Sequence, residues 1–527
     1  MAERTLSGRK VFDVAKLIQT PQKDQLLKRI RIRPIDGGLN ASKTSDQIEP
    51  TQQPAMQDVS YHKNEVRKAI GTTQVGADFS DVVMYSGVWE RLDGTFQAFA
   101  ITQKELYRYN PVTAAYVVVS PSVGGVELSG STSQRIQVSI FDDVLYFGSD
   151  ANVLRSWDGG AATTHAPVSG GFTCRGIEAV ANHLVLVATK TGAILDGQTV
   201  KWSQSGSVVF TGTGSGSNDL ADRDDICANI AKLGPYRALI YKTKSIVEMR
   251  STGDASAPFE FTELVGGLGI LLPYTLAPWA GGHFFVGNDE QVYTYNGANL
   301  EAIGDNIRDE LFDDLDHSLP NIAIGSYDSV ENEYILAIPI SGTDGNKRYY
   351  AYNIAKKRWR QGEYSGLMHL AQYPTRLTGT TLARERQVMA ASTFSKRVHL
   401  LNNEATFSFD ATALSFSIQT PDIIGQNDED EVTLKEFIIA HFVDGDMDLT
   451  VDASTDSGVT FANSVSVSFS ASATSHVAGS IHYIHVPFVV TGQSIRIRIR
   501  NNTPAQKIRF IGFTPVASFT ETARHHT

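Results

Sequence analysis

The chain has 527 residues, and its 42% hydrophobic content is enough to bury a core, which excludes disorder along its whole length. The formal net charge of −11 argues against a general nucleic-acid binder that holds DNA by neutralising phosphates. Residues 1–33 hold nine Lys or Arg and three acidic residues, a local charge of +6 that leaves −17 for the rest. Two cysteines are too few for a disulfide framework and favour folding in a reducing cytosol.

Residues 1–34 are predicted to form a short basic arm that is partly helical. Its apolar residues recur at helix spacing, first at Val11, Val14, Leu17 and Ile18, and again at Leu26, Leu27 and Ile30. Its last basic side chains are candidates for docking on an acidic partner: Lys28, Arg29, Arg31 and Arg33. The plainer alternative is a solvated basic tail.

Residues 35–420 carry a loose repeat, in which a short strand ends in an aromatic or turn residue. It recurs about every 45–57 residues, at Leu106–Asn110, Val153–Gly159, Val200–Trp202, Ser245–Met249, Gln291–Gly297, Tyr349–Asn353 and Arg397–Asn402. A second apolar strand precedes several copies, at Val144–Phe147, Leu184–Val187, Ala238–Tyr241 and His283–Val286. This spacing is typical of four-stranded β-propeller blades. A set of unrelated hairpins without closure is the alternative.

Residues 421–527 are predicted to form a β-sandwich after a polar, acidic linker at Gly425–Glu431. Apolar residues alternate with polar ones there, at Leu449, Val451, Val465, Val467, Phe469, Ile481, Tyr483, Val486, Ile495, Ile497 and Ile499. Ser454–Phe461 resembles an Asp-box turn, whose Asp and Ser bond the backbone of a tight hairpin. That motif is structural, so it indicates no catalysis.

No pattern in the sequence predicts a catalytic, cofactor-binding or metal-ligating residue. Asp444–Asp448 opens like a calcium loop, but Leu449 and Thr455 stand where that loop needs Gly and Glu, so a hairpin turn is predicted. The glycine-rich Gly212–Ser217 is followed by acidic residues, which would repel a phosphate. We therefore expect a protein that is not an enzyme and needs no cofactor.

Several short motifs follow one another along the chain: Gly37–Asn40, Gln53–Val59, Arg67–Gly71, Ser245–Ile246, Gly266–Gly269, Pro273–Tyr274, Gly287–Gly297, Ile303–Ile307, Glu333–Ala337, Tyr352–Asn353, Arg358–Trp359, Asp456–Phe461 and Ile495–Ile499. In this order they resemble the tail nozzle proteins of short-tailed phages, also called tail tubular or tail stabilisation proteins. The resemblance covers most of residues 35–520. The basic N-terminal stretch has no counterpart in it.

The resemblance implies a structural virion protein of the tail, assembled in the host cytoplasm as a hexamer. It would sit beneath the ring-shaped tail adaptor under the portal and enclose a DNA exit channel for genome ejection. Its partners would be the adaptor of the head-to-tail connector, tail fibre or needle proteins, the passing genomic DNA without sequence-specific binding, and indirectly the host envelope. An acidic channel wall repels phosphate and so avoids trapping the DNA.

Three other functions remain open at this point. A receptor-binding or glycan-binding tail protein would expose aromatic side chains in a cleft. A phage glycosidase built on the propeller would need two carboxylates facing each other across a cavity. A cellular propeller that assembles protein complexes is the third alternative.

Overall fold

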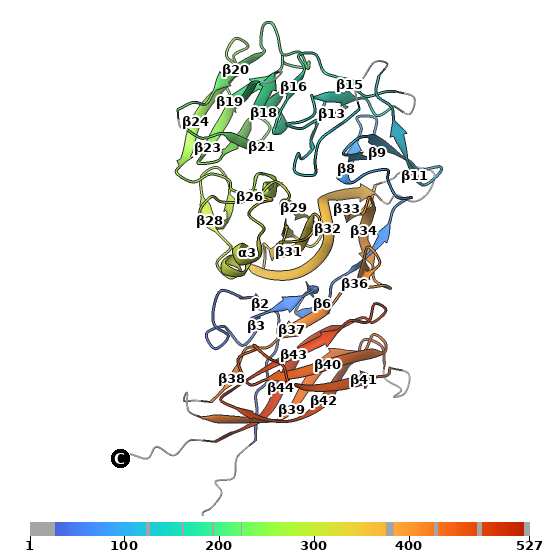
Figure 1. Cartoon of the computed structure of the whole chain (residues 1–527), viewed down its shortest axis with the longest axis vertical. Helices are drawn as coiled ribbons and strands as arrows, with labels where there is room; N and C mark the ends of the chain where they lie inside the picture. The colour runs from blue at the N-terminus through green and yellow to red at the C-terminus, as the bar shows by residue number, and fades with distance from the viewer. Residues whose placement is uncertain are drawn as a thin grey trace, which may run out of the picture.

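The computed structural model of the protein describes residues 27–122, 127–160, 163–191, 194–222, 224–375, 384–425, 430–471 and 477–520. These residues are mostly in strands, and they contain one α-helix, α3 (Arg308–Asp314), and one 3-10 turn, η1 (Pro273–Thr275). Figure 1 shows a ring of small sheets above a body of stacked sheets. The fold is therefore all-β, a propeller-like body with a C-terminal β-sandwich. Neither helical element in the described ranges is long and apolar enough to cross a membrane.

Five antiparallel sheets follow one another around the ring. Their strands are β8 (Val83–Glu90), β9 (Phe96–Thr102), β10 (Leu106–Asn110) and β11 (Ala115–Val119); β12 (Gln137–Phe141), β13 (Val144–Gly148), β14 (Arg155–Trp157) and β15 (Ala166–Pro167); β16 (Phe172–Thr173), β17 (Gly176–Val180), β18 (His183–Thr191), β19 (Ile194–Trp202) and β20 (Gly216–Asp219); β21 (Cys227–Gly234), β22 (Arg237–Lys242), β23 (Ser245–Ser251) and β24 (Phe259–Gly266); and β25 (Ala277–Trp279), β26 (Gly282–Val286), β27 (Val292–Tyr295) and β28 (Leu300–Ala302). One such sheet cannot cover both of its own faces, so neighbouring sheets pack radially. Trp89 of β8 meets Trp157 of β14 edge-on in this way, with ring centroids 5.8 Å apart.

A nine-stranded sheet closes the ring. It contains β29 (Ile324–Asp328), β30 (Glu333–Ile338), β31 (Asn346–Asn353), β32 (Arg358–Thr375), β33 (Arg384–Thr393), β34 (Val398–Asn403) and β7 (Gly71–Gln74), with β2 (Gly38–Leu39) and β3 (Gln52–Gln53) beside β32. The first part of β32 pairs with β31 and the second part with β33, so this strand serves two blades in turn. On this division, the described strands form seven blades, six of four strands and one, β16–β20, of five, and the last is closed by β7 against β34.

The predicted repeat coincides with one position in these blades. Every copy found in the sequence falls on the third strand of its blade: β10, β14, β19, β23, β27, β31 and β34. The apolar segments that precede four of the copies fall on the second strands β13, β18, β22 and β26. The second strands are covered on both faces, so most of their residues are apolar and buried. The closed ring replaces the alternative of unrelated hairpins.

Two six-stranded sheets form the sandwich below the ring (Figure 1). Sheet A, as we name it, contains β1 (Lys28–Arg29), β5 (Val59–His62), β6 (Glu65–Lys68), β39 (Glu431–Phe442), β42 (Ile481–Gly492) and β44 (Arg509–Thr520). Sheet C contains β4 (Met56–Gln57), β37 (Phe416–Gln419), β38 (Ile423–Ile424), β40 (Met447–Ser454), β41 (Asn463–Phe469) and β43 (Ser494–Asn501). A small hairpin, β35 (Ser408–Phe409) and β36 (Thr412–Ala413), precedes β37 in the chain. Phe437, Ile439, Ile497 and Phe510 are fully buried between the two sheets.

The strand pairing divides the chain differently from the predicted limits of 35–420 for the propeller and 421–527 for the sandwich. β4 and β6 pair with the C-terminal strands β37 and β44, β5 pairs with β6, and β37 also lies in sheet C. The chain thus passes from sandwich to propeller and back before it enters the blades at β7. Local sequence patterns indicate that a segment is a strand, but they do not identify its partner, so the sequence could not place this boundary.

The N-terminal arm differs from its prediction in the part that the structure describes. The predicted helix continuing through Leu27 and Ile30 is wrong, because β1 pairs antiparallel with β44, in the register Lys28 with Ala517. The backbone N–H groups of Ile30 and Ile32 donate to the carbonyls of Pro515 and Phe513. These sheet bonds outweigh a weak local helical preference. The rest of the predicted helical stretch, residues 1–26, lies outside the described residues.

Two further expectations in the sandwich concern turns. The predicted hairpin at Asp444–Asp448 is wrong, because this segment joins β39 of sheet A to β40 of sheet C, and Asp444 accepts hydrogen bonds from Arg509. The Asp-box turn is confirmed between β40 and β41. There, Asp456 accepts from the Thr460 backbone N–H at 2.8 Å, and the Ser454 hydroxyl donates to Asp456 at 2.6 Å.

Buried charged side chains join the propeller to the sandwich. The Arg360 guanidinium on β32 forms a nearly inaccessible ion pair with Glu333 on β30, with Nη2 and Oε2 2.6 Å apart. Its Nη1 also donates to the Val59 carbonyl of sheet A. Asp58, just before β5, accepts the backbone N–H of Glu363 on β32 and that of Ser415 before β37. Burial raises the pKa of Asp58 to about 7.

Candidate functional site

The basic segment flagged by the sequence lies along one edge of sheet A. Continuing the register of Lys28 with Ala517 places Arg29 opposite Val516, and the bridge between Ile32 and Phe513 extends the pairing. Successive side chains of an extended segment point to opposite faces of its sheet. Arg29, Arg31 and Arg33 therefore share the outer face of sheet A, and Ile32 faces the core.

The structure brings three of the four predicted docking residues together and separates the fourth. Arg29 and Arg31 are exposed, and Arg33 is half-buried. Lys28 points the other way, with its Nζ 5.1 Å from the centroid of the Phe519 ring. Because a two-residue step along a strand is about 6.6 Å, the three guanidinium groups form a positive stripe rather than a point charge.

Small residues let Arg33 reach across sheet A. The register aligns Gly512 of β44 with Ala440 of β39, and Ala440 with Tyr483 of β42. A Cβ on Gly512 would collide with Arg33 Cγ and with the Ile32 carbonyl oxygen, so glycine is required for this approach. The Arg33 guanidinium lies over the Tyr483 ring, 5.1 Å from its centroid, and its Nη1 donates to the Tyr483 hydroxyl at 3.4 Å.

Tyr483 is the aromatic centre of this surface. The hydrogen bond from Arg33, together with the charges of Arg33 and Arg31, lowers the pKa of the Tyr483 phenol below its ordinary value. The ring remains 45% exposed although the guanidinium covers one side. Aromatic and arginine side chains that are held in place but accessible are the residues that most often anchor protein–protein interfaces.

The rest of β42 extends the surface along the sheet edge. Ile481 is 49% and Val489 83% exposed, whereas the alternate residues Ile484 and Val486 are buried in the core. His485 contacts the Glu436 carboxylate of β39 through Nδ1 at 2.7 Å. Sheet A ends at β42, which pairs only with β39 in the described strand order. We name this surface, made by Arg29, Arg31, Arg33, Ile481, Tyr483, His485 and Val489, the docking face.

The sequence analysis located the basic part of the docking face but not its aromatic part. It counted Ile481 and Tyr483 among the alternating apolar residues together with Val486, and the structure places both on the outside and Val486 in the core. β42 carries apolar residues at odd and even positions alike, so the alternation does not identify the buried face. The feature that could have identified the exposed patch is the presence of apolar residues on both faces of β42, since a strand at a sheet edge that is apolar on its outer face exposes a hydrophobic surface.

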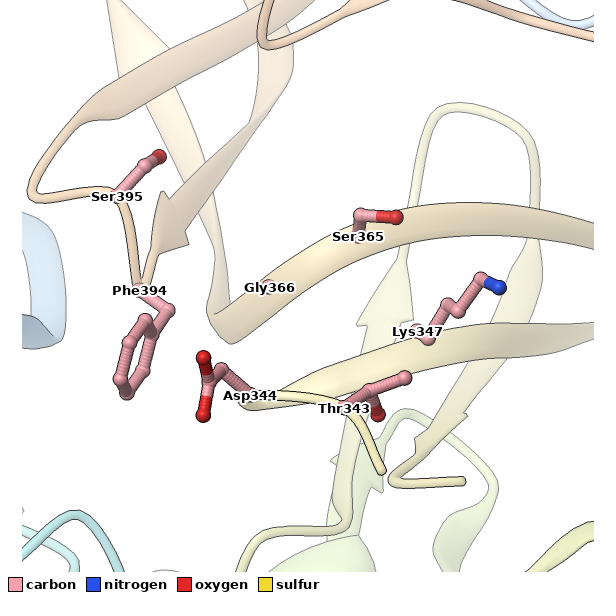
Figure 2. A pocket seen from close by; sticks show the side chains of 7 residues that line it. All are labelled: Thr343, Asp344, Lys347, Ser365, Gly366, Phe394 and Ser395. Carbon is pink, nitrogen blue, oxygen red and sulfur yellow. The ribbon is translucent and has the colours of Figure 1, made fainter. Parts of the chain in front are cut away.

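A pocket lies where β32 bends from one blade to the next. Thr343, Asp344, Lys347, Ser365, Gly366, Phe394 and Ser395 line this pocket, which has a volume of about 390 Å³. Figure 2 shows Phe394 and Asp344 at one end of the group and Lys347 at the other. The pocket thus combines one aromatic ring with hydroxyl groups and charges of both signs.

No family model matches the chain, and the search of curated proteins found no relative. Among solved structures, the chain is similar to Sqt1 of Saccharomyces cerevisiae, with 9% identity and a TM-score of 0.37 over 63% of this chain and 97% of that one. It is also similar to an exo-β-1,3-galactanase of Phanerochaete chrysosporium, with 10% identity and a TM-score of 0.27 over 84% of this chain and 100% of that one. These scores are too low to carry an argument about function. In the described residues, no group of three or more His, Cys, Asp or Glu could hold a metal ion.

Proposed function

We propose that this protein is a structural subunit of a short-tailed phage tail, the nozzle that extends the DNA exit channel beneath the adaptor. The observation that carries the proposal is the docking face, where Arg29, Arg31 and Arg33 stand in a row beside an exposed tyrosine. Such a face suits assembly onto an acidic protein partner. The order of the nozzle-like motifs along the chain gives the partner's class, the tail adaptor.

The joint between propeller and sandwich supports a mechanical role in a larger assembly. Four connections of the described chain cross between the two bodies, near residues 33–38, 53–56, 68–71 and 403–416. Arg360, which Glu333 holds within the propeller, donates to the Val59 carbonyl of the sandwich, and Asp58 accepts from Glu363 across the same joint. A tail segment has to transmit force without bending, and a joint of this kind resists hinge motion.

The charge distribution supports passage of DNA rather than binding. Outside the first 33 residues the chain carries −17, so a channel built from these subunits would repel phosphate on average. The positive stripe of the docking face would then be buried at a protein contact, away from the DNA. Assembly as a hexamer in the virion tail, with fibre or needle proteins at the far end, remains part of the proposal.

Negative-stain microscopy of the purified protein, alone and with tail extracts that contain the adaptor, tests the proposal. We expect six-fold rings or tubes with a central channel. A persistent monomer or trimer that attaches only to the periphery of tails would overturn it and favour a receptor-binding protein.

A matched pair of variants tests the docking face itself. Arg31→Glu reverses a charge on the face, and Lys28→Glu makes the same charge change on the opposite side of the segment. We expect Arg31→Glu to weaken attachment to adaptor-bearing tails at least about tenfold, equivalent to ~1.4 kcal/mol, and Lys28→Glu to leave it unchanged. Equal losses in both variants would assign the effect to general charge.

The pocket at the bend of β32 favours a second candidate, a glycan-binding tail protein. Phe394 could stack on a sugar ring, while Asp344 and the hydroxyls of Ser365 and Ser395 could bond its hydroxyl groups. Saturation-transfer NMR with host surface glycans tests this function. Binding that is lost in Phe394→Ala, with normal folding, would favour it over the nozzle, and no binding would remove it.

A further inference from the structure

A buried lysine and a buried asparagine meet where the two sheets of the sandwich come together. Lys68, the last residue of β6 in sheet A, is 2% exposed, and Asn501, the last residue of β43 in sheet C, is 4% exposed. The Lys68 Nζ donates to Asn501 Oδ1 at 3.0 Å and to the Thr503 carbonyl at 3.0 Å. Both acceptors are neutral, so neither balances the charge of the ammonium group, and burial of that charge is costly.

The surroundings favour the uncharged form of this amine. Burial lowers the pKa of Lys68 to about 8, and the charge of Asp58 opposes this shift only in part. The Phe407 ring lies with its centroid 5.7 Å from Nζ and is itself buried, so one side of the amine is apolar. A lysine that is desolvated in this way is a nucleophile near neutral pH, because a substantial fraction of the molecules carries a free lone pair on Nζ.

The Asn501 side chain is held with its carbonyl towards the lysine. Its Nδ2 donates to the Asp448 backbone carbonyl at 2.8 Å and to Gln506 Oε1 at 2.8 Å. These two bonds fix the plane of the amide and leave Oδ1 as the atom that meets Nζ. Cγ is one C=O bond, about 1.2 Å, beyond Oδ1, so it lies at most about 4.2 Å from Nζ, close to the ~3–3.5 Å that separates atoms about to react.

We propose that Lys68 and Asn501 form an intramolecular isopeptide bond. The Nζ lone pair attacks Asn501 Cγ, the Nζ–Cγ bond forms, and the Cγ–Nδ2 bond breaks. The proton that Nζ gives up passes to Nδ2, which leaves as ammonia, so the step needs no oxidant, reductant or further reactant. Nδ2 lies beside Gln506, a half-buried side chain at the surface, so the ammonia is released next to solvent.

The isopeptide bond joins residues that are 433 positions apart in the chain. The loop that it closes contains every blade of the propeller, from β7 to β34. Lys68 directly precedes the segment that leads into β7, so the cross-link fixes the ring-closing strand to sheet C. Such a link restricts the unfolded chain as a disulfide does, without requiring an oxidising compartment. The inference does not depend on the proposed tail function.

Mass spectrometry of the purified full-length protein tests the bond directly. We expect the intact mass to be lower than that of the amino-acid sequence by one ammonia, about 17 Da. Trypsin does not cleave after an acylated lysine, so a digest of the denatured protein should contain a branched peptide in which residues 68–91 are joined to residues 501–507. The fragment ions of this peptide should place the link between Lys68 and Asn501.

The matched variants are Lys68→Arg and Lys242→Arg. Lys68→Arg keeps the positive charge but removes the nucleophilic amine, so the mass loss and the branched peptide should both disappear. Lys242 is equally buried, but its Nζ contacts Asp225 and the Leu220 carbonyl instead of a side-chain amide, so Lys242→Arg should keep both.

Two results overturn the proposal: an unmodified wild-type mass after prolonged incubation above the pKa of Lys68, or a mass loss that persists in Lys68→Arg. The wild-type digest needs no variant, so the test holds even if Lys68→Arg does not fold.

Discussion

The propeller and the sandwich are both made of antiparallel sheets, but their strands find partners at different distances along the chain. Within the blades, nearly every strand pairs with the next one in sequence, as β21 to β24 do. In the sandwich, β1 pairs with β44 and β4 with β37, so the two ends of the described chain meet. Local pairing leaves a repeat that can be read in the sequence, whereas long-range pairing leaves none.

The long-range strand pairing of the sandwich couples its folding to that of the propeller. The sandwich cannot be completed until the last strand has been made, and its N-terminal strands connect directly to β7, which closes the ring. Closure of the propeller and completion of the sandwich therefore involve the same segment of chain. We expect the two bodies to unfold together rather than as independent domains.

Replacing Arg360, which forms an ion pair with Glu333 and a hydrogen bond to Val59, gives the strongest test of this coupling. Arg360→Met leaves the Glu333 carboxylate buried without its partner, which costs about 3–5 kcal/mol. We expect a large fall in Tm, measured by calorimetry, with one shared transition for propeller and sandwich. Lys357→Met is the control, since Lys357 and Glu301 form an exposed pair whose loss should cost ~0–1 kcal/mol. Two separate transitions in the wild-type protein would contradict the coupling.

The pH dependence of stability tests the contribution of Asp58 to the same joint between propeller and sandwich. Burial raises the pKa of Asp58 to about 7 from an ordinary value of 3.8, so the folded protein keeps this proton at a pH where the unfolded chain has lost it. The resulting stability is complete below about pH 4 and is lost as the pH rises to about 7, by up to ~4 kcal/mol.

Urea unfolding of wild type and Asp58→Asn at several pH values measures this contribution. The asparagine variant should lose the dependence between pH 4 and 7, although its baseline stability will also fall because one backbone N–H loses its acceptor. An identical pH profile in both proteins would show that Asp58 does not titrate in this range.

The smallest expected effect is a change in the pKa of Tyr483, which tests whether the basic segment lies on sheet A of the sandwich in solution. Arg33→Leu removes the hydrogen bond and the charge that lower the pKa of Tyr483, so this pKa should rise towards its ordinary value. Carbon-13 NMR of the tyrosine ring carbons across the alkaline range measures the shift. Lys28→Leu, on the other side of the segment, should leave Tyr483 unchanged. No change in Arg33→Leu would mean that the segment does not lie on sheet A.

The candidate site was predictable only in part. Local charge was enough to identify Arg29, Arg31 and Arg33, because a run of like charges is visible without any knowledge of the fold. It could not separate Lys28 from them, since that distinction follows from the extended conformation that β44 imposes. Tyr483 and Gly512 come from strands more than 400 residues further along the chain, so only the register of sheet A connects them to Arg33.

The amino-acid sequence alone determined the all-β class and the period of the blades, because each blade buries its central strands against its neighbours. The tertiary structure decided the partner of β1, the course of the chain between the two bodies and the outward face of β42. The reason is physical: a strand's periodicity records that its faces are covered, but not by which residues.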